Sequence, residues 1–287
     1  MKKPHLESTY KLFINGEWKE ASDKATYKSC CPANGEVLAE CAQATREDVE
    51  DAITAAWAAF ETWKNVPVNE RAEILNKVAD IIDENREHLA MVETLDNGKP
   101  IRETLNVDIP MAAQHFRYFA GCIMASEGSA NILGKDTLSL ILREPIGVVG
   151  QIVPWNFPFL MAAWKLAPVL ASGCCTVFKP SSSTSLSVLE LARLVQGVIP
   201  RGVFNVITGS GSKSGQYMLE SKRFRKLAFT GSTEVGRNVA LAAAERIIPA
   251  TLELGGKSAN IFFEDCDWEM AMDGLQMGIS QYNFICL

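Results

Sequence analysis

The chain has 287 residues, of which 47% are hydrophobic and 22% charged, and its formal net charge at pH 7 is -6. This balance is typical of a soluble globular protein. Because the chain has no run of Lys and Arg residues, nucleic acid is not an expected partner. The most apolar region, residues 148–170, contains three prolines and Lys165, so no membrane span is expected. The eight cysteines and three histidines lack the spacing of a zinc site. We therefore expect no metal site, and a cytoplasmic protein with reduced thiols.

The first part of the chain predicts a β-hairpin followed by helices. Residues 11–21 alternate around Asn15-Gly16, which favours a tight hairpin turn. Thr45 and Asp48 form a capping pattern before apolar residues at helical spacing. Three helices are predicted, over residues 45–63, 69–95 and 107–123.

The second part alternates short β-rich runs with helical stretches. The predicted strands lie within residues 147–155, 174–180, 202–209 and 226–231. The predicted helices cover residues 160–170, 185–198, 214–221 and 235–246. This alternation indicates an α/β fold with a mainly parallel sheet, and such sheets bind ligands at the carboxyl ends of their strands.

Polar residues follow the first two of these strands. Asn156, held between two prolines in "PWNFP", could donate hydrogen bonds to a developing oxyanion. On composition alone, a structural turn with a capping asparagine is the better interpretation. Lys179, before the serine-rich turn of "FKPSSSTS", suits a sugar hydroxyl or a phosphate. A solvated lysine beside a helix-capping cluster is equally compatible with that pattern.

Three later stretches are weaker signals by themselves. The segment "ITGSGSKSG" (207–215) matches neither the P-loop nor the dinucleotide fingerprint. Gly231 and Ser232 open a helix where backbone N–H groups could meet a pyrophosphate, although an ordinary helix cap has the same pattern. Glu253, between two leucines, suits a general base with raised proton affinity, but a buried and paired glutamate is the more common case.

Taken in order, the motifs "FINGEW", "LDNGKP", "REPIGVVGQIVPWNFP", "FKP", "FTGSTEVG" and "LELGGKSANI" resemble the aldehyde dehydrogenase superfamily. The resemblance extends from about residue 11 to residue 279. It implies oxidation of an aldehyde to a carboxylic acid with NAD(P)+, through a cysteine thiohemiacetal and thioester. It also implies a Rossmann-like, mainly parallel sheet flanked by helices, with only the start of a catalytic domain. The implied divisions are an N-terminal hairpin and helices (1–125), bridging strands used in oligomerisation (126–145), the NAD(P)-binding core (146–250) and the start of a truncated catalytic domain (251–287).

The resemblance assigns roles to individual residues. Asn156 resembles the side-chain half of the oxyanion hole, and Glu253 resembles the base that activates water. Lys165 resembles a supporting lysine near Asn156, and Lys179 resembles the lysine that holds the adenosine ribose. The implied cofactor-binding set is Ile152, Pro154, Trp155, Lys179, Ser182, Gly211, Gly215, Phe229, Gly231, Ser232 and Gly256.

The resemblance breaks before the expected nucleophile. "GLQMGI" (274–279) matches the family, whereas "SQYNFICL" (280–287) does not. Without gaps the nucleophile position falls on Leu287, so Cys286 is expected to be a stray thiol and this chain is expected to be inactive. The alternative is a non-catalytic nucleotide-binding fragment or pseudoenzyme that acts by association. An altered terminus or a shifted reading frame would each explain the abrupt change.

The resemblance also bears on cofactor choice and assembly. Many NAD-preferring relatives carry a glutamate three residues after the lysine, where this chain has Ser182. A neutral serine does not repel a 2′-phosphate, so we expect NAD to bind and NADP to be tolerated. The expected partners are a small aldehyde and further copies of the chain in a dimer or tetramer.

Overall fold

The computed structural model describes residues 4–256 and 259–276, and its centre is a seven-stranded sheet. Across the sheet the strands are β12 (Ala250–Leu254), β11 (Lys226–Gly231), β8 (Val148–Ile152), β9 (Cys175–Lys179), β10 (Phe204–Val206), β2 (Leu12–Ile14) and β3 (Glu17–Lys19). The five strands from β12 to β10 run parallel. The predicted α/β fold with a mainly parallel sheet is confirmed.

The N-terminal hairpin extends this sheet at one edge. Asn15 and Gly16 both adopt positive φ, 55° and 71°, and this geometry matches the twist of a tight two-residue hairpin turn. Phe13 of β2 pairs antiparallel with Val206 of β10, which joins the hairpin to the parallel strands. The hairpin predicted from Asn15-Gly16 is therefore confirmed, and it completes one side of the sheet.

The predicted helices are present with one correction. Helix α1 (Arg46–Trp63) begins with the capping box of Thr45 and Asp48. The single helix predicted over residues 69–95 is wrong, because α2 (Val68–Glu84) ends at Asn85 and α3 (Arg86–Asn97) begins after it. Asn85 has φ -105° and ψ 17°, outside the α-helical range, and this breaks the periodic run.

The helix predicted over residues 107–123 appears as α5 (Ile109–Met124). Between α3 and α5 lie α4 (Ile101–Glu103) and a π-helical turn, η1 (Thr104–Asp108), neither of which was predicted. Gly98, with φ 88°, ends α3 as a left-handed cap.

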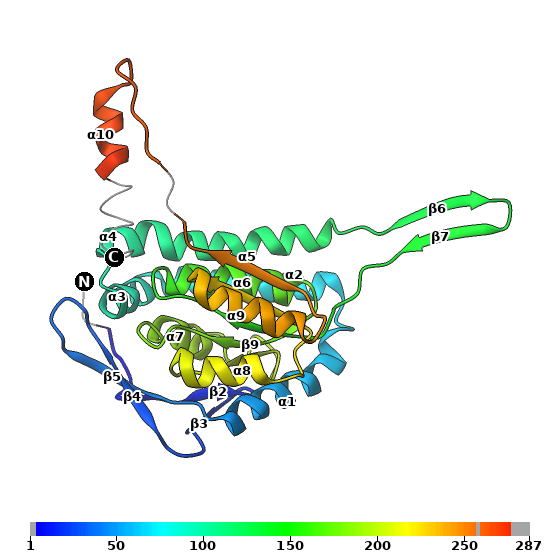
Figure 1. The fold of residues 1–287 in the computed structure, drawn as a ribbon, viewed down its shortest axis with the longest axis horizontal. Helices are drawn as coiled ribbons and strands as arrows, with labels where there is room; N and C mark the ends of the chain where they lie inside the picture. Colours follow the sequence, from blue (N-terminus) through cyan, green and yellow to red (C-terminus); the bar gives the residue numbers. More distant parts are fainter. Residues whose placement is uncertain (1–3, 257–258, 277–287) are drawn as a thin grey trace.

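The helices between the parallel strands match the predicted alternation. They are α6 (Pro158–Ala171), α7 (Leu186–Leu194), η2 (a π-helical turn, Gly211–Gly215), α8 (Gln216–Glu220) and α9 (Thr233–Ala244). Helix α6 contacts β9 and is itself contacted by α2 and α5, so this side of the molecule has two helical layers (Figure 1). Strand β9 is buried along its whole length, which accounts for its continuous apolar run.

A second, smaller sheet was not predicted. It consists of β1 (Thr9–Tyr10), β5 (Val37–Ala42) and β4 (Thr26–Cys30), in that order. Because β4 pairs only with β5, its other backbone edge is free within the part of the chain that the structure describes.

Two parts extend from the body of the molecule (Figure 1). The antiparallel ribbon of β6 (Ser129–Gly134) and β7 (Thr137–Ile141) lies within the segment 126–145. Helix α10 (Trp268–Gln276) stands beyond β12. The predicted division between residues 250 and 251 falls inside β12, so the parallel sheet continues past it. Among the described residues, none of the helices is long and apolar enough to cross a membrane.

Candidate functional site

The strand register brings the first candidates to one level of the sheet. Ile152, the last residue of β8, is paired with Lys179 of β9 on one side and with Phe229 of β11 on the other. Each of these strands ends at or soon after that level. The side chains that follow them therefore gather at a single edge, as expected for the carboxyl ends of parallel strands.

Lys179 is buried at this edge and has few partners. Its side chain is 3% exposed, and within the described residues its ammonium donates one hydrogen bond, to the Pro180 carbonyl at 3.0 Å. Burial lowers the pKa of Lys179 to about 8. A Cβ added to Gly215 would lie 3.6 Å from Cε of Lys179 and take up space beside its stem. The Lys179 ammonium has three N–H donors and uses one of them on a described acceptor. With a glycine beside it, this ammonium fits a ligand rich in hydroxyl groups.

The next strand end opens a helix at a glycine. Ser232 caps α9, and its hydroxyl accepts a hydrogen bond from the Val235 N–H at 3.3 Å. A Cβ on Gly231 would lie 2.5 Å from the Phe229 ring, so this ring packs directly over the glycine. The start of a helix with 12 residues offers free N–H groups and a positive dipole end to an anion.

Two glycines of the predicted set are exposed. Gly211 begins the π-helical turn η2 that contains Gly215, and Gly256 follows β12. At both positions a Cβ would meet nothing within 4 Å among the described residues. The structure therefore shows no steric need for glycine at Gly211 or Gly256, in contrast to Gly231.

The loop after β8 carries Asn156. Nδ2 of Asn97 donates to the Trp155 carbonyl at 2.6 Å and so ties this loop to the end of α3. Pro154 is half-buried, and Trp155 is 40% exposed. The Asn156 amide makes no hydrogen bond to any described residue, and its Oδ1 is buried. Asn156 therefore presents an amide that no described residue uses.

A buried charged cluster supports the same loop and was missed in the sequence. Oε1 of Glu93 accepts from the Phe159 N–H at 3.2 Å, at the start of α6. Nζ of Lys99 lies 2.5 Å from a carboxylate oxygen of Asp108 and 3.3 Å from the centre of the Phe157 ring. The available signal was the density of polar residues in "ETLDNGK" at the end of a helix, which indicates more than a helix stop.

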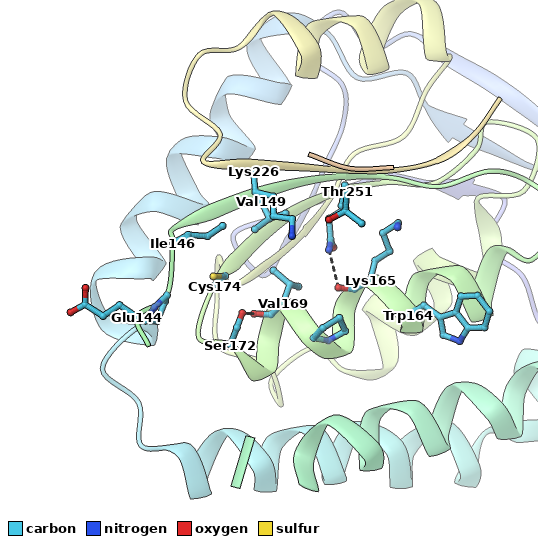
Figure 2. A pocket seen from close by; sticks show the side chains of 14 residues that line it. Glu144, Ile146, Val149, Trp164, Lys165, Val169, Ser172, Cys174, Lys226 and Thr251 are labelled. Atoms are coloured by element: carbon cyan, nitrogen blue, oxygen red, sulfur yellow. Dashed lines mark hydrogen bonds between the residues drawn. The ribbon is translucent and has the colours of Figure 1, made fainter. Parts of the chain in front are cut away.

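Lys165 lies on α6, at a different part of the molecule from Lys179. Figure 2 shows it on the wall of a 380 Å³ pocket between α6 and the sheet, where Nε2 of Gln151 donates to the Lys165 carbonyl at 2.8 Å. Burial lowers the pKa of Lys165, and the nearby charge of Glu253 opposes that shift. Val149 and Thr251 also line the pocket, and both lie near the amino ends of their strands. This pocket is therefore separate from the edge where Lys179 lies.

Glu253 is not in the apolar surroundings that its sequence suggested. It lies exposed on β12, and the neighbouring Leu254 is 42% exposed. Strand β12 forms an edge of the sheet, and among the described residues it pairs with a strand on one side only, while α9 packs against one of its faces. Because Glu253 is exposed, neither a carboxylate in apolar company nor the alternative of a buried, paired glutamate is found among the described residues. Cys286 lies outside the described residues.

Comparison with known proteins relates the chain to one protein family. The chain matches the model of the aldehyde dehydrogenase family over residues 18–283. It is 49% identical over 283 residues to an acetaldehyde dehydrogenase of Pseudomonas aeruginosa, and the alignment covers 96% of this chain and 56% of that protein. It is 50% identical over 261 residues to an aldehyde dehydrogenase of Vibrio cholerae, covering 91% of this chain and 52% of that protein.

The fold is also that of solved members. An aldehyde dehydrogenase from Bacillus cereus, solved as a complex with NAD+, superposes with a TM-score of 0.93 at 41% identity. That alignment covers 97% of this chain and 59% of the Bacillus cereus chain. The chain thus spans about half the length of the curated relatives it matches. The predicted resemblance is confirmed, and the chain belongs to the aldehyde dehydrogenase family.

Proposed function

We propose that the protein binds NAD and serves the NAD-dependent oxidation of an aldehyde to a carboxylic acid. The observation that carries this proposal is the gathering of Lys179, Gly215, Gly231 and Ser232 at one edge of the parallel sheet. The Bacillus cereus relative, which has the same fold over this chain, was solved with NAD+ bound.

The residues at this edge fit the parts of a dinucleotide. The Lys179 ammonium has donors to spare for ribose hydroxyls, because one described acceptor contacts it. The helix start at Ser232, next to the side-chain-free Gly231, suits the pyrophosphate. When bound, NAD would supply the hydride acceptor for the oxidation.

Three further residues are proposed to serve the oxidation. The Asn156 amide, free of described partners and fixed through Trp155 by Asn97, would donate to the oxyanion as it develops. Glu253, exposed on β12, would take a proton from the attacking water, and Lys165 would act as a positioning residue near it. Cys286 lies outside the described residues, so its interpretation as a stray thiol stays a prediction from sequence.

Titration calorimetry with NAD tests the proposal without requiring turnover. We expect saturable binding of one NAD per chain, with an affinity in the micromolar to submillimolar range that is usual for cofactors and substrates, on the order of 1 μM–1 mM. The absence of saturable binding at millimolar NAD, in a sample shown to be folded by circular dichroism, would refute the proposed cofactor function.

Cofactor choice is expected to depend on Ser182. Ser182→Glu would place a carboxylate in the turn after Lys179, next to the proposed ribose site. The negative charge of this carboxylate would repel the 2′-phosphate of NADP. We expect NADP affinity to fall by about tenfold to hundredfold while NAD affinity changes little. Competition titrations of both nucleotides measure the change. An unchanged NADP affinity would leave Ser182 as a helix-capping residue only.

Self-association is proposed to involve the ribbon of β6 and β7. Ile132 and Leu138 are directly paired across the ribbon and are 84% and 60% exposed. Exposed apolar patches of this kind mark interaction sites, and a second copy of the chain is the proposed partner. The free thiols of the described cysteines support the proposed cytoplasmic location.

Replacing both apolar residues of this pair, Ile132→Ser with Leu138→Ser, is expected to shift the chain toward monomer, because the apolar face of the ribbon is lost. Sedimentation velocity measures the change in mass. Asn131→Ser, an exposed polar position on the same strand, serves as the control and should leave the mass distribution unchanged. An unaltered oligomer in the double variant would exclude the ribbon as the interface.

A further inference from the structure

The 380 Å³ pocket between α6 and the sheet is built by the register of three parallel strands. Ala228 of β11 is paired with Gln151 of β8 on one side and with Thr251 of β12 on the other. Side chains alternate between the two faces of a strand, so Lys226, two residues before Ala228, shares its face. Lys165 reaches the same space from α6, as Figure 2 shows. The pocket therefore brings two lysines together from opposite walls.

The two lysine side chains share this pocket without a counter-ion. Within the described residues, the ammonium groups of Lys165 and Lys226 form no ion pair and no hydrogen bond. Burial lowers the pKa of Lys165, the charge of Glu253 opposes this shift, and the charge of Lys226 adds to it. The two ammonium groups are thus close enough to repel each other. An anion placed between them would offset this repulsion.

The carboxylates around the pocket leave the two lysines unpaired. Glu144 is the one acidic residue among the described lining residues, and Figure 2 shows its carboxylate directed away from Lys165. Glu253 follows Thr251 by two residues on β12 and so lies on the same face of that strand. No ion pair joins Glu253 to either lysine in the part of the chain that the structure describes. The negative end of a ligand could therefore approach both ammonium groups.

Neutral groups make the rest of the lining amphipathic. The Thr251 hydroxyl has no hydrogen-bond partner among the described residues. Gln151 is fixed in place, because its Oε1 accepts from the Thr176 hydroxyl at 3.0 Å and its Nε2 donates to the Lys165 carbonyl at 2.8 Å. Most of the remaining lining is apolar and includes Pro145, Ile146, Val149, Pro168 and Val169. Such a pocket suits a ligand with an anionic group and a hydrocarbon body.

We propose that this pocket binds a small carboxylate with a hydrocarbon body, and that Lys226 and Lys165 hold its carboxylate group. The oxygens would accept charge-assisted hydrogen bonds from the two ammonium groups and a further one from the Thr251 hydroxyl. The hydrocarbon part would displace water from the apolar lining. An inorganic anion would gain the charge but not these apolar contacts. The inference does not depend on the proposed dinucleotide site, which lies at another part of the sheet.

Titration calorimetry at constant ionic strength and pH 7 tests the site with three probes: pentanoate, acetate and the uncharged pentanamide. We expect saturable binding of pentanoate, with an affinity about tenfold or more above that of acetate, because acetate lacks most of the hydrocarbon. Pentanamide should bind at least about tenfold more weakly than pentanoate, because it carries no charge for the lysines.

Variants of Lys226 assign the binding to this pocket. Lys226→Met removes the charge at similar length and is expected to lower pentanoate affinity by about tenfold or more, whereas Lys226→Arg should stay within about threefold of the wild type. Lys222→Met, at an exposed position outside the lining, is the matched control and should leave the affinity unchanged. Circular dichroism establishes that each variant is folded.

Three results would overturn the inference. They are the absence of saturable pentanoate binding to the wild type at tens of millimolar, equal affinities of pentanoate and pentanamide, and equal pentanoate affinity in the wild type and Lys226→Met. None of them bears on NAD binding, which is measured separately on the same chain. Conversely, a chain that fails to bind NAD but binds pentanoate through Lys226 would refute the proposed cofactor function and support the carboxylate site.

Discussion

Replacing Lys179 with methionine is expected to stabilise the fold while it removes cofactor affinity. The ammonium is buried with one described hydrogen bond, to the Pro180 carbonyl, so the folded state bears an incompletely compensated desolvation cost. Methionine has a similar shape and no charge. We expect the free energy of unfolding at pH 7 to rise by about 1–3 kcal/mol and NAD affinity to fall by at least about tenfold.

The pH dependence identifies the cause of that gain. The folded pKa of Lys179, about 8, lies below the unfolded value of 10.5, so between these values the unfolded chain binds a proton that the folded chain does not. Wild-type stability should therefore rise with pH across this window. The advantage of Lys179→Met should be largest below pH 8 and shrink above it.

Urea unfolding at a series of pH values, with NAD titrations on the same proteins, measures both effects. Lys222→Met, at an exposed position, is the control and should change neither stability nor binding. A Lys179→Met variant that is less stable than the wild type at pH 7 would show that the ammonium is well compensated. A variant that keeps NAD affinity would remove Lys179 from the cofactor site.

Glu93→Gln is expected to remove a pH-dependent loss of folding stability that arises beneath the loop carrying Asn156. Burial raises the pKa of Glu93 to about 7, from 4.5, despite the opposing charge of Lys99. Between these values the folded state binds a proton that the unfolded state does not, so wild-type stability should fall as pH rises from about 4.5 to about 7. Glutamine keeps an acceptor for the Phe159 N–H and carries no charge.

The variant should therefore match the wild type at pH 5 and exceed it at pH 8 by about 1–3 kcal/mol. Chemical unfolding at the two pH values measures the difference. Glu87→Gln, at an exposed position of the same helix α3, should be neutral at both. If the gain at pH 8 is absent, Lys99 holds Glu93 in its charged form more strongly than burial opposes it.

The main sheet could be predicted because its signals are local. The Asn15-Gly16 turn, the apolar runs of β8 and β9, and the capping residues Thr45 and Ser232 each depend on a few neighbouring residues. The small sheet of β1, β5 and β4 was not predicted. Buried and exposed residues do not alternate regularly along its strands, so the sequence lacks the period of a half-buried strand. In addition, β1 pairs with β5 across about thirty residues, and a local sequence pattern cannot predict such a pairing.

The site was predictable in part for the same reason. Parallel strand ends meet at one edge, so the proximity of Lys179 and Phe229 follows from topology. The cluster of Glu93, Lys99 and Asp108 was missed because the density of polar residues near the end of α3 does not show that their charges are buried, which depends on tertiary packing. The apolar surroundings expected for Glu253 were wrong because alternation with leucine does not specify which face of a strand is covered.

Hydrogen–deuterium exchange with and without NAD reports where the nucleotide binds. We expect slower exchange on NAD addition in residues 179–183, 210–216 and 230–236, which follow β9, β10 and β11, and little change in the ribbon of β6 and β7. Protection confined to the 380 Å³ pocket beside Lys165, or none at saturating NAD, would contradict a dinucleotide site at these strand ends.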